Sequence, residues 1–400
     1  MHVAVLGGPS ARGRRVVRDL LERPEVNRVV LIGSDHRQLE RLAAGFGGDL
    51  VTVATAAPTV EGIAGALSEV DVALAAIAND SSAEVTAFEA ALLARVPYVT
   101  ACEDPALVEV LLSPRFTPEP RTQANAGVTA GATSVGVTTA IADEPVVIGM
   151  SWSPGLSNLL VRAAAERLDA IRSVRVAWST SRNDEGADGL GRLIAGWSGD
   201  ATVIKGGAPH RRSPGSGSEQ VFFPEPVGWQ RVHTVRGAEV ALAKLLPGLD
   251  SLVVEGGMGG ASASTLAQMV ARAPAAQAAP VAALGKAAEG HPASSTRRRL
   301  GILTRAPALG LGPFARRPSG WSALRIDVTG RSGGATRTLT YGVVDHLANL
   351  EAVPLVAAAL LLGREAVAGR GVMAPEAAFA PGPFLAQLAE FGIRVAHLEC

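Results

Sequence analysis

Residues 2–21 read HVAVLGGPSARGRRVVRDLL, and this stretch decides the fold. An apolar run at 2–7 ends in Gly7-Gly8, and apolar residues at helical spacing follow over 16–21. The pattern predicts a buried strand, a glycine turn and a helix. In a Rossmann fold, such a unit presents backbone N–H groups and the positive end of the helix dipole to a diphosphate. The stretch therefore predicts the opening of a dinucleotide-binding domain.

The alternation of strand and helix continues outward from this unit. Apolar runs typical of buried strands are RVVLIG (28–33), DLVTVAT (49–55), DVALAAIA (71–78), VPYVTAC (96–102) and PVVIGMSW (145–152). Segments with helical spacing separate the runs of the first hundred residues, and Asp35 is expected to cap one of these helices. Strands without apolar–polar alternation are typical of parallel sheets covered by helices on both faces. We therefore expect a Rossmann-type α/β domain.

The pattern changes from about residue 172. Strand-like runs with turn-rich joins follow, and 321–344 predicts a hairpin with Gly330–Gly334 at its tip. We expect an inserted α+β domain with an antiparallel sheet for substrate binding and dimerisation. The further expected elements are a surface excursion over 113–144, helices near 189–198, 237–246, 263–289 and 350–368, and a last strand that returns to the first domain. The predicted domains are residues 1–152 plus about 345–400, and residues 153–344.

Composition narrows the class of protein. Charged residues make up 18% of the 400, and the formal net charge is zero, so no basic field favours nucleic acid as a partner. The two cysteines, Cys102 and Cys400, lie far apart in sequence and indicate neither a disulfide framework nor a metal site. The most apolar segment, 353–363, is too short to span a membrane and predicts a buried helix. We expect a cytoplasmic protein with a small-molecule substrate.

The predicted cofactor loop departs from the usual glycine pattern. The candidate cofactor-binding residues of the loop are Gly7, Gly8, Pro9, Ser10, Ala11, Arg12 and Gly13. Ser10 stands at the middle position, where a glycine usually lets the backbone approach the phosphates, and Pro9 has no N–H to offer. Two readings stay open: the loop binds a dinucleotide, or it is a Rossmann turn that no longer holds a cofactor.

The end of the second strand carries the other cofactor signal. An NAD enzyme usually places Asp or Glu there for the ribose hydroxyls, whereas this chain has Gly33-Ser34. Ser34 and Arg37, with Arg12 and Arg14 nearby, suit a 2′-phosphate better, because hydroxyl and guanidinium groups complement its charge. If a dinucleotide binds, we expect NADPH rather than NADH.

Hydride transfer also needs a group that moves a proton. The candidates are Asp80, Glu103, Asp104, Asn158, His233 and His346. The first three follow the fourth and fifth strands, whose carboxyl ends border the predicted cleft, and Asn158 follows a Pro-Gly turn. Helix capping is the alternative role of the residues that precede helices, and a structural role is the alternative for each histidine.

Five segments in the same order resemble the saccharopine dehydrogenase-like family. They are VAVLGG…GRRVVRDLL (3–21), the stretch 71–105, SPGLSNLLVRAAAERLDAI (153–171), the stretch 221–249, and GVMAPE (371–376) before PFLAQL. The resemblance covers nearly the whole chain except 113–144 and 271–320. It implies a Rossmann domain, an inserted α+β substrate and dimerisation domain, and NAD(P)-linked redox chemistry at a C–N or C=C bond. It also implies a homodimer, and it puts Ala78 and Asn79 near the nicotinamide.

The chain departs from the family pattern at three places that shape the pocket. Asn79-Asp80 stands where many relatives have Gly-Pro, Thr100 where they have an acid, and 236–239 reads RGAE. The first hypothesis is an NADPH-dependent reductase of a C=N or activated C=C bond. The second is a non-redox cyclase or isomerase with a degenerate or repurposed cofactor site, and the third is a binding protein on the same fold.

Overall fold

The computed structural model describes residues 1–77, 80–113, 143–181, 196–197, 199–259 and 320–399. The chain divides into two compact units. Unit 1 comprises Met1–Ala163 and Glu351–Gly392, and unit 2 comprises Ala164–Leu350 and Ile393–Cys400. Each unit is described by itself below.

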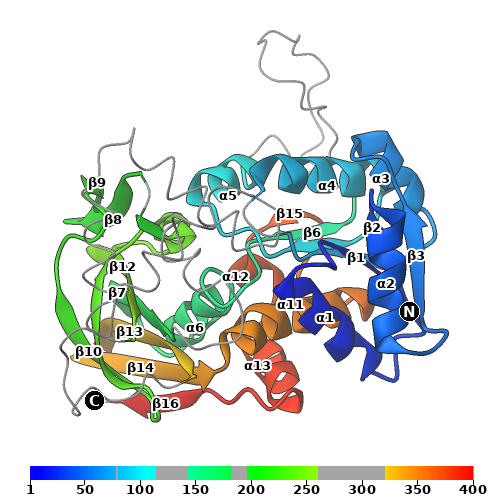
Figure 1. Cartoon of the computed structure of the whole chain (residues 1–400). Helices are drawn as coiled ribbons and strands as arrows, with labels where there is room; N and C mark the ends of the chain where they lie inside the picture. Colours follow the sequence, from blue (N-terminus) through cyan, green and yellow to red (C-terminus); the bar gives the residue numbers. More distant parts are fainter. Residues whose placement is uncertain (78–79, 114–142, 182–195, 198, 260–319, 400) are drawn as a thin grey trace, which may run out of the picture. The chain divides into compact units, whose positions relative to one another are not determined.

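Unit 1 is built on a seven-stranded parallel sheet (Figure 1). Its strands are β1 (His2–Leu6), β2 (Arg28–Gly33), β3 (Val51–Thr55), β4 (Val72–Ala75), β5 (Tyr98–Thr100), β6 (Pro145–Ile148) and β15 (Gly371–Met373). They lie in the order β15-β6-β5-β4-β1-β2-β3. The predicted parallel sheet is confirmed. The order reverses between β1 and β4, which is where ligands bind in open α/β sheets.

Helices cover both faces of this sheet. The helices that lie wholly or mostly in unit 1 are α1 (Ala11–Leu21), α2 (His36–Phe46), α3 (Val60–Leu67), α4 (Ser81–Ala94), α5 (Pro105–Leu111), α6 (Leu156–Ala165), α11 (Leu347–Gly363), α12 (Pro375–Ala378) and α13 (Pro381–Glu390). Figure 1 shows α3 and α4 on one side of the sheet, and α1, α11 and α13 on the other. Asp35 caps α2 as predicted, because its carboxylate accepts the N–H of Gln38 at 3.0 Å.

The core of unit 1 explains why its central strands lack an alternation of apolar and polar residues. Every residue of β4 is fully buried, because helices exclude water from both faces of the strand. The apolar segment 353–363 lies within α11 and is buried along most of its length, as predicted. Among the described residues, no helix is both long and apolar enough to cross a membrane.

Unit 2 contains a mixed sheet. Its strands are β7 (Ala170–Thr180), β8 (Ala201–Lys205), β9 (Ala208–Arg212), β10 (Glu219–Phe223), β11 (Gly228–Thr234), β12 (Ser251–Met258), β13 (Ser322–Ser332), β14 (Ala335–Asp345) and β16 (Ala396–Glu399). The main order is β10-β11-β12-β7-β13-β14-β16, and β8 joins β12 and β9 at the side. The pairs are antiparallel except β12 with β7, which is parallel.

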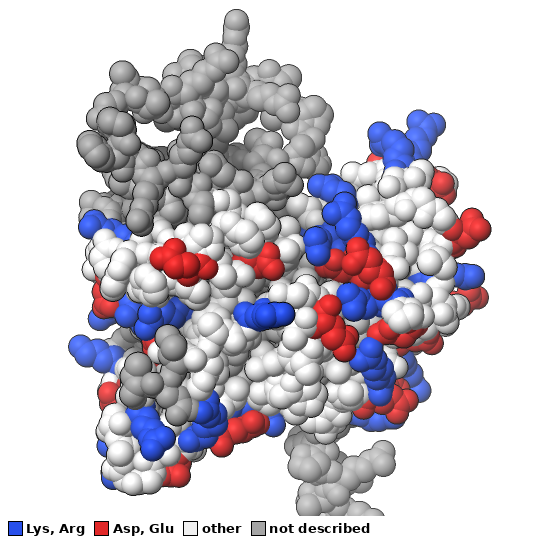
Figure 2. Space-filling model, turned by 90° about the horizontal axis from the view of Figure 1, so that it is seen from below, with Lys and Arg blue, Asp and Glu red and all other residues white. Residues whose placement is uncertain are grey.

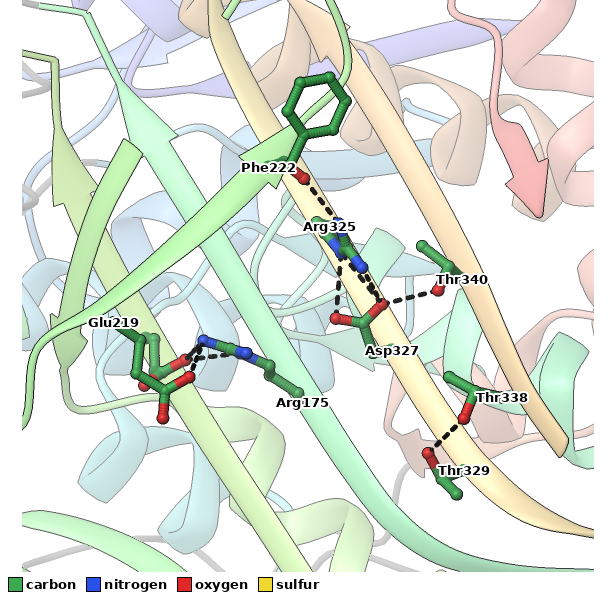
Figure 3. A network of polar contacts seen from close by, with 9 residues as sticks. Arg175, Glu219, Phe222, Arg325, Asp327, Thr329, Thr338 and Thr340 are labelled. Carbon is green, nitrogen blue, oxygen red and sulfur yellow. Dashed lines mark hydrogen bonds and ion pairs between the residues drawn. The ribbon is translucent and has the colours of Figure 1, made fainter. Parts of the chain in front are cut away.

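One face of this second sheet carries a polar network (Figure 3). The Arg175 guanidinium lies 2.7 Å from the carboxylates of both Glu219 and Glu255. The Arg325 guanidinium pairs with Asp327 at 2.9 Å on the same strand. Figure 2 shows basic and acidic side chains interspersed over the visible surface, as expected from the balanced composition.

Several expectations for the second half are corrected. The closing strand does not return to the first domain: β16 pairs with β14, so the chain end adds hydrogen bonds to the second sheet. The turn of the predicted hairpin is Gly333–Gly334, both with positive φ, whereas Gly330 lies inside β13 at a bulge. The helix near 237–246 is a 3₁₀ helix, η1 (Ala238–Leu245). The helix predicted near 263–289, most of the helix predicted near 189–198 and most of the 113–144 excursion lie outside the described residues.

Candidate functional site at the carboxyl end of the parallel sheet

At two positions of the glycine loop after β1, neighbouring backbone atoms leave no room for a side chain. A Cβ on Gly7, whose φ is +80°, would lie 2.8 Å from the backbone carbonyl carbon of Ala76 after β4. A Cβ on Gly13 would lie 2.2 Å from the carbonyl oxygen of Gly7. Both glycines are therefore required where the loop packs against β4 and against the first turn of α1, as in a nucleotide-binding turn.

Ser10 makes hydrogen bonds to other residues of the same loop. Its hydroxyl oxygen accepts the N–H of Gly13 at 2.9 Å and donates to the carbonyl oxygen of Gly7 at 2.8 Å. The backbone N–H of Ser10 also donates to the carbonyl of Gly7. Two amides are thus used within the loop, and Pro9 has none to give. A diphosphate here would rely on the remaining N–H groups of the first turn, which have no intrahelical partners.

Arg12 connects the loop to two carboxylates. Its guanidinium is buried and lies 2.9 Å from the Glu103 carboxylate and 3.4 Å from the Glu351 carboxylate of α11. A further contact of 3.5 Å reaches the carbonyl of Ile77. The guanidinium is therefore held by protein acids, so its placement does not favour the 2′-phosphate contact considered from the sequence.

Glu103 is the catalytic candidate that the structure brings to the glycine loop. Besides the pair with Arg12, its Oε1 accepts the hydroxyl of Ser151 at 2.8 Å. Ser151 follows β6 and Glu103 follows β5, so one carboxylate oxygen joins the loops of neighbouring strands to α1. The Glu103 side chain is 24% exposed, which leaves a carboxylate that solvent or substrate can reach.

Sequence reasoning missed a second acid at this edge, Glu84 of α4. Its carboxylate is buried and lies 2.6 Å from the hydroxyl of Thr100 at the end of β5. Burial raises the pKa of Glu84 to about 8, against the opposing effects of the Thr100 hydrogen bond and the Arg12 charge. Ala87, Phe88 and Ala91 of α4 are buried at helical spacing from Glu84, and this periodicity could have revealed the acid.

The other candidates beside the sheet have structural contacts. Asp80 caps α4 by accepting the N–H of Ala83 at 3.1 Å, and Asp104 caps α5 by accepting the N–H of Ala106 at 3.0 Å. The capping role weighed for them is therefore observed. Asn158 is buried in α6 and donates to the carboxylate of Glu376 at 2.8 Å. Ala78 and Asn79 lie outside the described residues.

The two histidine candidates belong to unit 2. The Nδ1 of His233 lies 2.6 Å from the carbonyl oxygen of Gly217, and the residue is buried in β11. The Nδ1 of His346 lies 3.0 Å from the carbonyl oxygen of Gly320, and its ring stacks on Trp321 at 4.5 Å between centroids. Both histidines thus have structural contacts within unit 2.

The residues after β2 remain open to solvent. Ser34 and Arg37 are exposed, and so is Arg14, which donates to the carbonyl of Pro9. Asp35 is engaged as the helix cap described above. Because β1 and β2 are adjacent, this exposed edge borders the glycine loop.

Comparison with known proteins gives a fold-level result. Neither the family models nor the curated proteins contain a match to this chain. Apo saccharopine dehydrogenase (L-Glu forming) from Saccharomyces cerevisiae is similar in structure, with a TM-score of 0.67, 14% identity, and coverage of 100% of this chain and 99% of that chain. An NADPH-dependent quinone oxidoreductase from Escherichia coli matches 24% of this chain and 34% of its own, at 22% identity and a TM-score of 0.21. The full-length match shows that this chain has a saccharopine dehydrogenase-like fold.

Proposed function

We propose that this protein is an NAD(P)-dependent oxidoreductase that prefers NADPH and reduces a C=N or activated C=C bond of a small metabolite. The observation that carries the proposal is the tight glycine turn between β1 and α1, at the point where the sheet order reverses. Backbone amides at such a turn attract a diphosphate. The redox activity named for the yeast structural neighbour supports the same class of reaction.

The preference for NADPH rests on the edge beside β2. Ser34 and Arg37 are exposed there, and the nearby Asp35 carboxylate is occupied with the N–H of Gln38. A 2′-phosphate would gain a hydroxyl and a guanidinium partner.

Glu103 is our choice for the group that moves a proton. Bound NADPH would supply the hydride, and the protein would contribute an acid or base held in place. The partly exposed Glu103 carboxylate is fixed by the Arg12 guanidinium and the Ser151 hydroxyl. The homodimer implied by the family resemblance remains a prediction.

A non-redox cyclase or isomerase is the second candidate, and the Ser10 hydrogen bonds favour it. They occupy two loop amides that a dinucleotide would otherwise use. Ser10→Gly combined with Gly33→Asp restores the usual pattern of an NAD site. If the loop chemistry alone has changed, this variant binds NADH more tightly than the wild type does.

Calorimetric titration of the full chain with NADPH and NADH tests the proposal. We expect micromolar binding of NADPH and weaker binding of NADH. If folded protein gives no binding heat with NADPH and none with NADH, the redox proposal is overturned and the second candidate remains.

A further inference from the structure

Thr100 links a buried acid to the loops that carry the candidate site. Its hydroxyl is the partner of Glu84 and also accepts the N–H of Cys102 at 3.1 Å. Its carbonyl oxygen accepts the N–H groups of Gly149 at 3.1 Å and Met150 at 2.7 Å. One residue therefore orders the start of the loop after β5 and the start of the loop after β6.

Those two loops meet again at Glu103. Cys102 directly precedes Glu103, and Met150 directly precedes Ser151, whose hydroxyl donates to the Glu103 carboxylate. Glu103 in turn holds the Arg12 guanidinium at the start of α1. Hydrogen bonds and directly adjacent residues thus connect Glu84, through Thr100 and Glu103, to the helix that faces the proposed diphosphate site.

Burial and the surrounding charges both act on the protonation state of Glu84. Burial is the largest effect and favours the neutral acid; Glu103 and Asp80 add repulsion, whereas Arg12 attracts the charged form. From β5 and the loop after it, the groups beside Glu84 are Tyr98 and Cys102, whose pKa values are raised by burial and by Glu84 itself. In the neutral state, Glu84 does not compete with Glu103 for the Arg12 guanidinium.

We propose that Glu84 is a positioning residue that, as a neutral acid, holds Thr100 and thereby keeps Glu103 and Arg12 in place for nucleotide binding. Ionised Glu84 places a third carboxylate near Arg12 and adds negative charge behind the proposed diphosphate site. Both effects weaken binding of an anionic nucleotide. The consequence for binding rests on the proposed function, whereas the link from Glu84 to Glu103 does not.

The pH dependence of NADPH binding tests the proposal. In the wild type, we expect the Kd for NADPH to rise about tenfold between pH 7 and pH 9, as a single charge nearby would cause. Glu84→Gln keeps the size of the side chain but cannot ionise, so its Kd should stay flat over this range. Glu89→Gln, on the same helix and away from these contacts, is the matched control and should follow the wild type. An unchanged pH profile in Glu84→Gln would overturn the proposal.

A second measurement separates this inference from the proposed function. Unfolding free energies of Glu84→Gln, Glu103→Gln and the double variant form a cycle that needs no nucleotide. A positioning link predicts non-additive effects, because Thr100, the partner of Glu84, orders the loop that carries Glu103, and both acids interact with Arg12. If NADPH never binds but the cycle is non-additive, the redox proposal fails and the link stands. Additive effects would overturn the link whatever binds.

Discussion

The Glu103 carboxylate lies 2.9 Å from the guanidinium of Arg12, and this ion pair joins the first turn of α1 to the loop after β5. Arg12 of the predicted cofactor loop is thus paired with Glu103, which is a predicted catalytic residue. A phosphate entering the site would find backbone amides and the exposed edge after β2, with the buried cation already neutralised.

Removing this cation should destabilise the protein. Arg12→Met deletes the charge that faces Glu103 and Glu351, and the buried position of Glu351 makes the loss costly, about 3 kcal/mol. Chemical denaturation measures the change. Arg211→Met breaks an exposed ion pair with Asp200 and should change stability by less than about 0.5 kcal/mol. Equal losses in both variants would contradict the importance of burial.

The tight loop predicts a difference between two glycines of unit 1. Gly13→Ala forces a Cβ against the Gly7 carbonyl and should cost about 1–3 kcal/mol in unfolding free energy. Gly45→Ala in α2 meets no atom within 4 Å and should stabilise by up to about 1 kcal/mol. Thermal unfolding of the two variants compares them directly, and a neutral Gly13→Ala would show that the loop has room.

Cofactor preference should depend on Arg37. Arg37→Ala removes the guanidinium proposed to meet a 2′-phosphate and should weaken NADPH binding about tenfold while leaving NADH binding unchanged. Arg41→Ala, one turn further along α2, controls for loss of positive charge on the same helix. Calorimetry with both nucleotides gives the comparison. Parallel losses for NADPH and NADH would place the 2′-phosphate elsewhere.

Stability should fall as pH rises between about 4.5 and 8 because of Glu84. The folded protein keeps a proton on Glu84 to about pH 8, whereas the unfolded chain loses it near the ordinary pKa of 4.5. The unfolded state therefore binds fewer protons in this interval, and this one group lowers the unfolding free energy by up to about 1.4 kcal/mol per pH unit. Glu84→Gln should remove that contribution, as seen by denaturation at a series of pH values. A slope identical to that of the wild type would exclude a buried neutral Glu84.

The parallel sheet was predictable because its central strands are continuous apolar runs. Val72–Ala75 and Val3–Leu6 are buried on both faces, so the hydrophobic signal is undiluted. The strands of the second sheet have a weaker hydrophobic pattern in the sequence than those of the parallel sheet. β9 (Ala208–Arg212) is exposed throughout, and β16 pairs with a strand more than fifty residues earlier, which no local pattern can indicate.

The sequence predicts where the candidate site lies, but it does not predict which of its residues contact one another. The glycine loop and the acids after the strands follow from topology, and the capping roles of Asp80 and Asp104 follow from residue type. The pairing of Arg12 with Glu103 joins positions far apart in sequence and depends on tertiary packing. The sequence did not single out Glu84, because a glutamate in the first turn of a helix usually faces solvent. An acid at that position is already explained by its favourable interaction with the helix dipole.

The place of β16 at the side of β14 has a consequence for handling the protein. β14 is an eleven-residue strand, and β16 occupies part of the row of N–H and C=O groups on its outer side. Trimming the chain after Gly392 would uncover that row, and an uncovered strand of this length is a template for pairing with the same strand of another molecule. Shortened forms should therefore form intermolecular β-structure and precipitate, and preparations are best made with the carboxyl terminus left intact.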